Sequence, residues 1–219
     1  MTKTADSSFK IADYLLQIKA IKLQPSKPFV WASGWKSPIY CDNRKTLSYP
    51  VIRTYIRQQF VEVINEKFGK PDVIAGVATG GIAIGALVAQ DLGLPFVYVR
   101  SEAKKHGLSN QIEGVIEKGQ SVVVIEDLIS TGGSSLIAVE ALRGAGAQVK
   151  GLVSVFTYDF KIAVEAFKKA KCTYETLCDY HALVEQALKT RYIDEADVAS
   201  LKKWREDPAN WSPNLHASL

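Results

Sequence analysis

Residues 122–135 read VVVIEDLISTGGSS, a short stretch in which the chemistry changes twice. Four apolar residues, Val122 to Ile125, are followed by two acids, Glu126 and Asp127, and then by a run rich in hydroxyl groups and glycine, Ser130 to Ser134. An apolar run of this length that ends in turn formers is typical of a buried strand, and the apolar positions after the run recur at helical spacing. The stretch therefore predicts strand, loop and helix.

The neighbouring segments repeat this alternation of strand and helix. Strands are predicted at 73–77, 95–100, 121–126 and 149–158, and helices at 81–93 and beyond residue 134. Strands that alternate with helices favour a parallel sheet covered on both faces. We therefore expect an α/β fold with a central parallel sheet flanked by helices.

The ends of the chain add further elements. Ile11, Leu15, Ile18 and Ile21 lie on one side of a predicted N-terminal helix that stops before Pro25. Two short β-prone pieces, at 29–34 and 37–42, suggest a small hairpin. Further elements are predicted as a helix from residue 50 to residue 68, helical segments at 162–170, 178–189 and 194–206, and a short strand at 172–177.

Composition limits the class of protein. With 219 residues, of which 47% are hydrophobic and 23% charged, the chain has the length and composition of a single domain with one sizeable core. A net charge of +4, spread along the sequence, favours small anions over DNA as ligands. Three cysteines without metal-ligand spacing, no signal-like start and no membrane-length apolar run indicate a cytoplasmic protein.

The hydroxyl-rich turn is the first candidate binding site. Ligands of open parallel sheets bind beyond the carboxyl ends of the strands, where backbone N–H groups at a helix N-terminus attract anions. The turn Ser130, Thr131, Gly132, Gly133 and Ser134 would hold a phosphate monoester. Glu126 and Asp127 at its edge suit a ligand that also carries a sugar diol or Mg²⁺. The alternative is that the two acids only cap the next helix.

A second turn and a long polar segment extend this site. GVATGG at 76–81, which includes Thr79 and Gly80, again joins a strand to a helix and predicts another anion site, although glycines needed only for packing would give the same pattern. The polar segment 101–114 is long enough for an active-site lid. Arg100, Lys104, Lys105 and His106 bring positive charge to it, unless the segment is simply a solvated charge run.

Two other phosphate motifs can be set aside. The chain has no GxxxxGK[ST] sequence, so a P-loop is not supported. Gly144-Ala145-Gly146 lacks the third glycine of a dinucleotide fingerprint and is expected to be a turn between a helix and a strand.

These residues resemble known motifs. VVVIEDLISTGGS is similar to the phosphoribosyl pyrophosphate signature of type I phosphoribosyltransferases, with Glu126 as its first acid. VRSEAKKHG resembles the catalytic loop of orotate phosphoribosyltransferases at Arg100, Lys104 and His106, with Ser101 where some members carry a second lysine. FVWASGWKSPIYCDNR matches the N-terminal segment of the same family, although Ala32 stands where one branch has lysine.

The resemblance implies a fold and a reaction. It implies a Rossmann-like single domain over residues 1–219, in which residues 1–48 add a helix and a small N-terminal hood. It also implies Mg²⁺-dependent transfer of ribose 5-phosphate from 5-phosphoribosyl 1-diphosphate to orotate. The products are orotidine 5'-phosphate and diphosphate, in the biosynthesis of pyrimidine nucleotides. In the family the lid reaches the neighbouring subunit, so a homodimer that shares the 101–113 loop is expected.

The expected site residues fall into three groups, and no protein side chain is assigned as a direct metal ligand. Catalysis is assigned to Arg100, Lys104, His106 and Asp127. Binding of phosphoribosyl diphosphate is assigned to Arg100, Lys104, His106, Glu126, Asp127, Leu128, Ile129, Ser130, Thr131, Gly132, Gly133, Ser134, Thr79 and Gly80. Orotate binding is assigned to Ser130, Lys36 and Arg44.

Two rival functions remain open at this point. One is a ligand-sensing regulator that uses the same fold to bind a nucleotide and contacts nucleic acid elsewhere. The other is transfer of the phosphoribosyl group to a purine base.

Overall fold

The computed structural model describes residues 5–30, 34, 36–100 and 111–213. Lys104 and His106 therefore lie outside the described residues. The elements, in chain order, are α1 (Ala5–Gln17), β1 (Ile21–Leu23), β2 (Phe29–Val30), β3 (Lys36–Ser37), β4 (Ile39–Cys41), η1 (Asn43–Ser48), α2 (Pro50–Val63), η2 (Ile64–Phe68), β5 (Val73–Val77), α3 (Gly80–Leu92), β6 (Phe96–Val99), β7 (Ile112–Glu113), β8 (Ser121–Ile129), α4 (Gly133–Gly144), β9 (Gln148–Thr157), α5 (Lys161–Lys169), β10 (Tyr174–Asp179), α6 (Tyr180–Lys189) and α7 (Glu195–Glu206).

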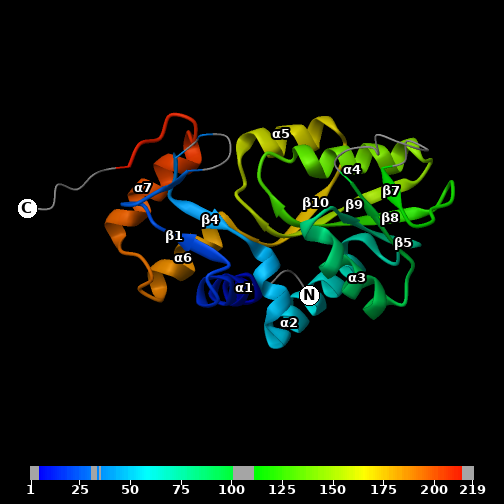
Figure 1. Cartoon of the computed structure of the whole chain (residues 1–219), viewed down its shortest axis with the longest axis horizontal. Coiled ribbons are helices and arrows are strands. Elements are labelled where there is room, and N and C mark those ends of the chain that lie inside the picture. Colours follow the sequence, from blue (N-terminus) through cyan, green and yellow to red (C-terminus); the bar gives the residue numbers. More distant parts are fainter. Residues whose placement is uncertain (1–4, 31–33, 35, 101–110, 214–219) are drawn as a thin grey trace, which may run out of the picture.

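The core of the molecule is a six-stranded sheet in the order β10-β9-β8-β5-β6-β7. Its strands are parallel, except that β7 pairs antiparallel with β6 at the edge. β8 lies between β9 and β5, so the segment that predicted the fold is a central strand. The predicted α/β class is confirmed, and Figure 1 shows helices on both sides of the sheet.

Alternation of side chains along β8 divides the core in two. Val123 and Ile125 join the cluster that contains α1, α2, α3 and α6, whereas Val122 and Val124 join the cluster that contains α4 and α5. Successive side chains of a strand point to opposite faces of the sheet. A run of apolar residues without polar interruption is therefore what a strand needs when helices cover both of its faces.

The N-terminal helix is shorter than predicted. It ends at Gln17, and Lys19 adopts a left-handed backbone conformation with φ of 54°. Ile18 and Ile21 are buried as the spacing suggested, but Ile21 belongs to β1, which pairs antiparallel with β4. The four apolar residues are all buried, as predicted, but the prediction that the helix continues to Ile21 was wrong. The chain turns at Lys19, and the residues after the turn still face the core.

The remaining N-terminal segments follow the prediction more closely. A hairpin does form between β2 and β3, with Phe29 opposite Ser37. Most of the second predicted piece, however, is β4, which pairs with β1 instead of with β2. The helix from residue 50 continues to Val63 and then widens into a short π-helix that ends before Gly69. Among the described helices, none is long and apolar enough to cross a membrane.

The central strand is longer than predicted. β8 continues to Ile129, and its pairing with β9 extends to the pair Ile129 and Thr157. Asp127, Leu128 and Ile129 therefore belong to the strand, which was predicted to end at Glu126. Beyond α4, Gly146 has φ of 87° between helix and strand, which confirms the turn predicted for the GAG sequence.

Candidate active site at the ends of β5 and β8

The two glycine-bearing turns lie together at one edge of the sheet. β5 and β8 are adjacent parallel strands, with Gly76 opposite Ile125, so their carboxyl ends meet. One cavity of about 290 Å³ is lined by Ala78, Thr79, Gly80, Glu126, Asp127, Leu128, Ser130, Thr131, Gly132, Gly133 and Ser134. The two turns thus lie next to each other, as predicted. Ile129, which was also assigned to binding of the sugar diphosphate, is fully buried and does not line the cavity.

Glycine is required where the second turn approaches β8. A Cβ atom on Gly80 would overlap the Asp127 carboxyl group, and one on Gly81 would overlap the carbonyl oxygen of Ile125. Gly76 has a backbone oxygen, that of Gly81, only 2.6 Å from its Cβ position. Close packing therefore explains why glycine is needed at positions 76 and 81. The same turn also lines the cavity through Thr79 and Gly80, so packing is not its whole role.

The helices that begin at these turns have no side-chain cap. The N-cap residues Thr79 of α3 and Gly132 of α4 make no side-chain capping hydrogen bond, whereas Asp179 and Asp194 cap α6 and α7 in the usual way. The first N–H groups of a helix have no partner within the helix. Two helices therefore present polar N-termini to the same cavity, which is the arrangement that binds anions.

The two acids do not cap α4, so the alternative interpretation is wrong. Glu126 accepts hydrogen bonds from the backbone N–H of Asp127 at 2.9 Å and from the hydroxyl group of Ser135 at 3.0 Å. Asp127 is partly exposed and lies against Gly80. Burial of the Glu126 carboxyl, followed by the charge of Asp127, raises the pKa of Glu126 well above its ordinary value.

Asn43 connects the N-terminal segment to this strand and was not predicted. Its side chain is 2% exposed, and its amide nitrogen donates to the carbonyl oxygen of Asp127 at 2.6 Å. The thiol of Cys41 donates to the Asn43 amide oxygen at 3.3 Å. Burial, and then the charge of Asp127, raise the pKa of the Cys41 thiol. No periodicity in the sequence pointed to a contact between residues so far apart.

The predicted cationic residues that the structure describes, Arg44, Arg100 and Lys36, lie outside the cavity. Arg44 is exposed and bonds Asp42 at 2.7 Å; this contact, and more weakly the charge of Asp127, raise the pKa of Arg44. Arg100 follows β6 and forms an ion pair with Glu113 of β7 at 3.5 Å. Lys36 is exposed in β3. None of the three lines the cavity.

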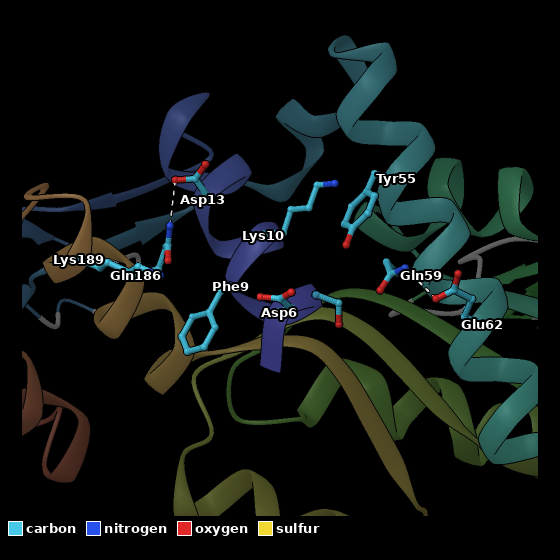
Figure 2. Close-up of a pocket in the computed structure, with 10 residues that line it drawn as sticks. Asp6, Phe9, Lys10, Asp13, Tyr55, Gln59, Glu62, Gln186 and Lys189 are labelled. Carbon is cyan, nitrogen blue, oxygen red and sulfur yellow. Dashed lines mark hydrogen bonds between the residues drawn. The ribbon is translucent and has the colours of Figure 1, made fainter. Parts of the chain in front are cut away.

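A larger hollow of about 530 Å³ lies elsewhere, between α1, α2 and α6 (Figure 2). It mixes acids such as Asp6 and Glu62 with Lys10 and Lys189, and the ammonium group of Lys10 lies 4.4 Å from the centre of the Tyr55 ring. None of its lining residues belongs to either turn. Size alone therefore does not identify the site, whereas the two glycine-bearing turns that meet in the smaller cavity do.

Comparison with known proteins identifies the family of this chain. The profile of the phosphoribosyl transferase domain family matches residues 49–182. Orotate phosphoribosyltransferase of Phocaeicola vulgatus is 61% identical over 95% of this chain and 98% of its own length. The Bacteroides thetaiotaomicron enzyme is 60% identical over 91% and 94%. The crystal structure of orotate phosphoribosyltransferase from Aeropyrum pernix has a TM-score of 0.73 at 28% identity, over 84% of this chain and 99% of that one. The chain therefore belongs to the phosphoribosyltransferases, and within them to the family of orotate phosphoribosyltransferases.

Proposed function

We propose that this protein transfers ribose 5-phosphate from 5-phosphoribosyl 1-diphosphate to orotate. A bond forms between a ring nitrogen of the base and C1 of the ribose, using an electron pair of that nitrogen, and the nitrogen loses its proton. The bond from C1 to the diphosphate oxygen breaks, and its electrons leave with diphosphate. The observation that carries the proposal is the single cavity into which two uncapped helices open, in a chain 61% identical to an orotate phosphoribosyltransferase.

The two turns suit the two ends of this substrate. The turn from Ser130 to Ser134 would bind the 5-phosphate through backbone N–H groups and hydroxyl groups, and Thr79 with Gly80 would bind the diphosphate. Asp127 stands between them, where it could accept hydrogen bonds from the ribose hydroxyl groups. Positioning of the substrate and stabilisation of the leaving diphosphate would then supply most of the rate.

Charge balance in the cavity supports this assignment. Burial, followed by the charge of Asp127, raises the pKa of Glu126, which shifts this carboxyl toward its neutral form beside a site for a polyanion. Among the described residues, no group of three or more His, Cys, Asp or Glu side chains could hold a metal ion. Mg²⁺ usually binds through one or two carboxylates together with substrate phosphates, so Asp127 and the diphosphate fit it, and it would neutralise the leaving group.

The finer assignments extend beyond the cavity. We assign Arg100, Lys104 and His106 to stabilisation of the diphosphate, and Ser130, with Arg44 and Lys36, to binding of orotate. Ser130 lines the cavity, and Arg44 follows the segment that Asn43 ties to Asp127. A homodimer in which the 101–113 loop completes the neighbouring site, and a cytoplasmic location, belong to the same proposal.

Consumption of 5-phosphoribosyl 1-diphosphate tests the proposal when orotate, hypoxanthine, adenine and uracil are offered separately with Mg²⁺. We expect turnover with orotate alone, and loss of that turnover when a chelator removes Mg²⁺. Turnover with hypoxanthine or adenine instead would favour purine transfer. Binding of the sugar diphosphate without turnover of any base would favour the regulator.

A further inference from the structure

The last described helix is firmly attached to the end of β9. Trp204 of α7 is fully buried, and its ring centre lies 5.4 Å from that of Phe160, 5.7 Å from that of Tyr158 and 5.8 Å from that of Tyr180. Aromatic side chains of this size contribute large buried areas and fixed orientations. Arg205, the next residue, therefore starts from a well-defined position.

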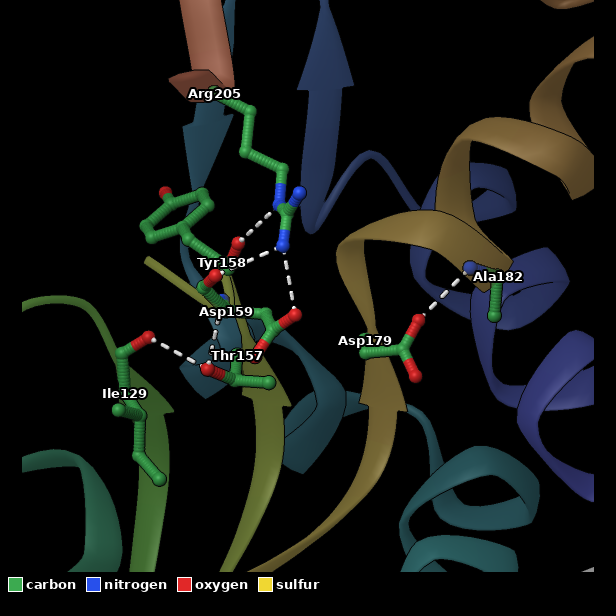
Figure 3. A network of polar contacts seen from close by, with 7 residues as sticks. All are labelled: Ile129, Thr157, Tyr158, Asp159, Asp179, Ala182 and Arg205. Atoms are coloured by element: carbon green, nitrogen blue, oxygen red, sulfur yellow. Dashed lines mark hydrogen bonds and ion pairs between the residues drawn. The ribbon is translucent and has the colours of Figure 1, made fainter. Parts of the chain in front are cut away.

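Arg205 uses that position to hold the segment after β9, as Figure 3 shows. Its guanidinium group donates to the carbonyl oxygens of Tyr158 at 3.3 Å and Asp159 at 3.0 Å. It also pairs with the Asp159 carboxylate at 2.7 Å. Asp159 has φ of 55°, a left-handed conformation that is uncommon for residues other than glycine, although aspartate adopts it more readily than most.

The contacts continue from Asp159 to Ile129, the residue directly before the phosphate-binding turn (Figure 3). The backbone N–H of Asp159 donates to the hydroxyl oxygen of Thr157 at 3.0 Å, and that hydroxyl group donates to the carbonyl oxygen of Ile129 at 3.3 Å. Thr157 is 2% exposed. Ile129 is the last residue of β8, and Ser130, the first residue of the turn, follows it directly.

A cavity of about 600 Å³ lies beside this chain of contacts. Thr131, Asp159, Lys161 and Arg205 are among the residues that line it. Thr131 also lines the candidate active site, so this cavity adjoins the same turn. The C-terminal helix therefore connects to the residue before that turn through Asp159, Thr157 and Ile129, and it shares a cavity with the turn itself.

We infer that Arg205 is a positioning residue, which fixes the phosphate-binding turn through Asp159, Thr157 and Ile129. The inference rests on the proposed function, in which this turn binds the 5-phosphate. It gives the C-terminal helix a part in substrate binding, although no residue of that helix lies among those predicted for the site. Loss of Arg205 lets Asp159 leave its left-handed conformation, removes the restraint on the Thr157 hydroxyl group and loosens the turn.

Arg143 provides a control, because it makes similar contacts at a place where it would contribute to stability alone. Arg143 of α4 donates to the carbonyl oxygens of Ala170 at 2.8 Å and Lys171 at 3.1 Å and pairs with Glu140 at 2.7 Å. Lys171 also has a left-handed backbone, with φ of 48°. Both arginines thus hold two carbonyl oxygens and a carboxylate beside a residue with a left-handed backbone. Arg143, however, does so from the C-terminal end of α4, whereas the phosphate-binding turn precedes the N-terminal end of that helix.

The test compares Arg205→Ala, Arg205→Lys, Thr157→Val and Arg143→Ala. Calorimetry measures the dissociation constant for 5-phosphoribosyl 1-diphosphate with Mg²⁺, and thermal unfolding measures stability. We expect Arg205→Ala and Thr157→Val to weaken binding about tenfold, or about 1.4 kcal/mol, which is the order of one hydrogen bond to the phosphate that a loosened turn no longer makes well. Arg205→Lys should restore part of the loss. Arg143→Ala should lower the melting temperature as Arg205→Ala does, yet keep wild-type affinity.

Several outcomes would overturn the inference. Wild-type affinity in Thr157→Val would do so even if Arg205→Ala did not fold, because that variant removes the last contact without touching α7. Equal weakening by Arg143→Ala would show that any loss of stability has the same effect. Failure of the wild-type protein to bind the sugar diphosphate would instead overturn the proposed function, and the inference with it.

Discussion

A methyl group added at Gly80 should separate activity from stability. Its Cβ atom would overlap the Asp127 carboxyl group, which must rotate away from the cavity. A hydrogen bond to a charged group contributes about 1.5 to 3 kcal/mol, so displacement of Asp127 should lower kcat/KM by about 10- to 150-fold. Asp127 is partly exposed and can rotate at little cost, while alanine favours the helix by up to about 1 kcal/mol. The free energy of unfolding should change by less than about 1 kcal/mol.

The assay is steady-state turnover of orotate with 5-phosphoribosyl 1-diphosphate, alongside unfolding in urea. Gly144→Ala is the control, because a Cβ atom at that position of α4 meets nothing within 4 Å. In an Asp127→Ala background, where no carboxyl group is left to displace, Gly80→Ala should add no further loss. Full activity of Gly80→Ala, or losses that add in the double variant, would refute the reasoning.

Three more predictions concern the neighbouring residues. Glu126→Gln should become more stable relative to wild type as the pH rises. The pKa of Glu126 is raised in the folded wild-type protein, so its protonated form stabilises the fold below the ordinary value of 4.5, and the wild-type protein loses this contribution at higher pH. A difference in melting temperature between the two proteins that stays constant from about pH 5 to about pH 8 would contradict this. Asn43→Ala should destabilise the protein by about 1 to 3 kcal/mol in urea unfolding, since it leaves the buried carbonyl group of Asp127 without its donor, and an unchanged midpoint would argue against that contact. Lys104→Ala should lower kcat by about 10²-fold if one charged contact contributes about 3 kcal/mol to the transition state, and unchanged kinetics would remove the loop from the mechanism.

The sheet could be predicted because its strands carry a strong local signal. Val122 to Ile125 are apolar without interruption, since both faces of β8 are covered, and glycine or hydroxyl residues follow the strands where turns begin. The end of β8 could not be read in this way. The strand was predicted to end at Glu126, yet its pairing with β9 continues through Leu128 and Ile129. Backbone pairing there outweighs side-chain preference.

The site was predictable where its residues are consecutive and not where distant segments meet. The turn from Ser130 to Ser134 was found by its composition alone. Asn43 reaches Asp127 across 84 positions of sequence, and Arg205 reaches Asp159 across 46. Neither contact leaves a periodic pattern, because each depends on how whole elements pack. The N-terminal helix was overextended for a related reason, since its buried side continues into β1.

A crystal structure with 5-phosphoribosyl 1-diphosphate and Mg²⁺ would test the central claim, that two helix N-termini hold opposite ends of one substrate. The 5-phosphate should accept hydrogen bonds from backbone N–H groups between residues 131 and 134, with the diphosphate against Thr79 and Gly80 and the ribose hydroxyl groups within reach of Asp127. A ligand with both phosphate groups outside these two turns, for example in the hollow between α1, α2 and α6, would contradict the account.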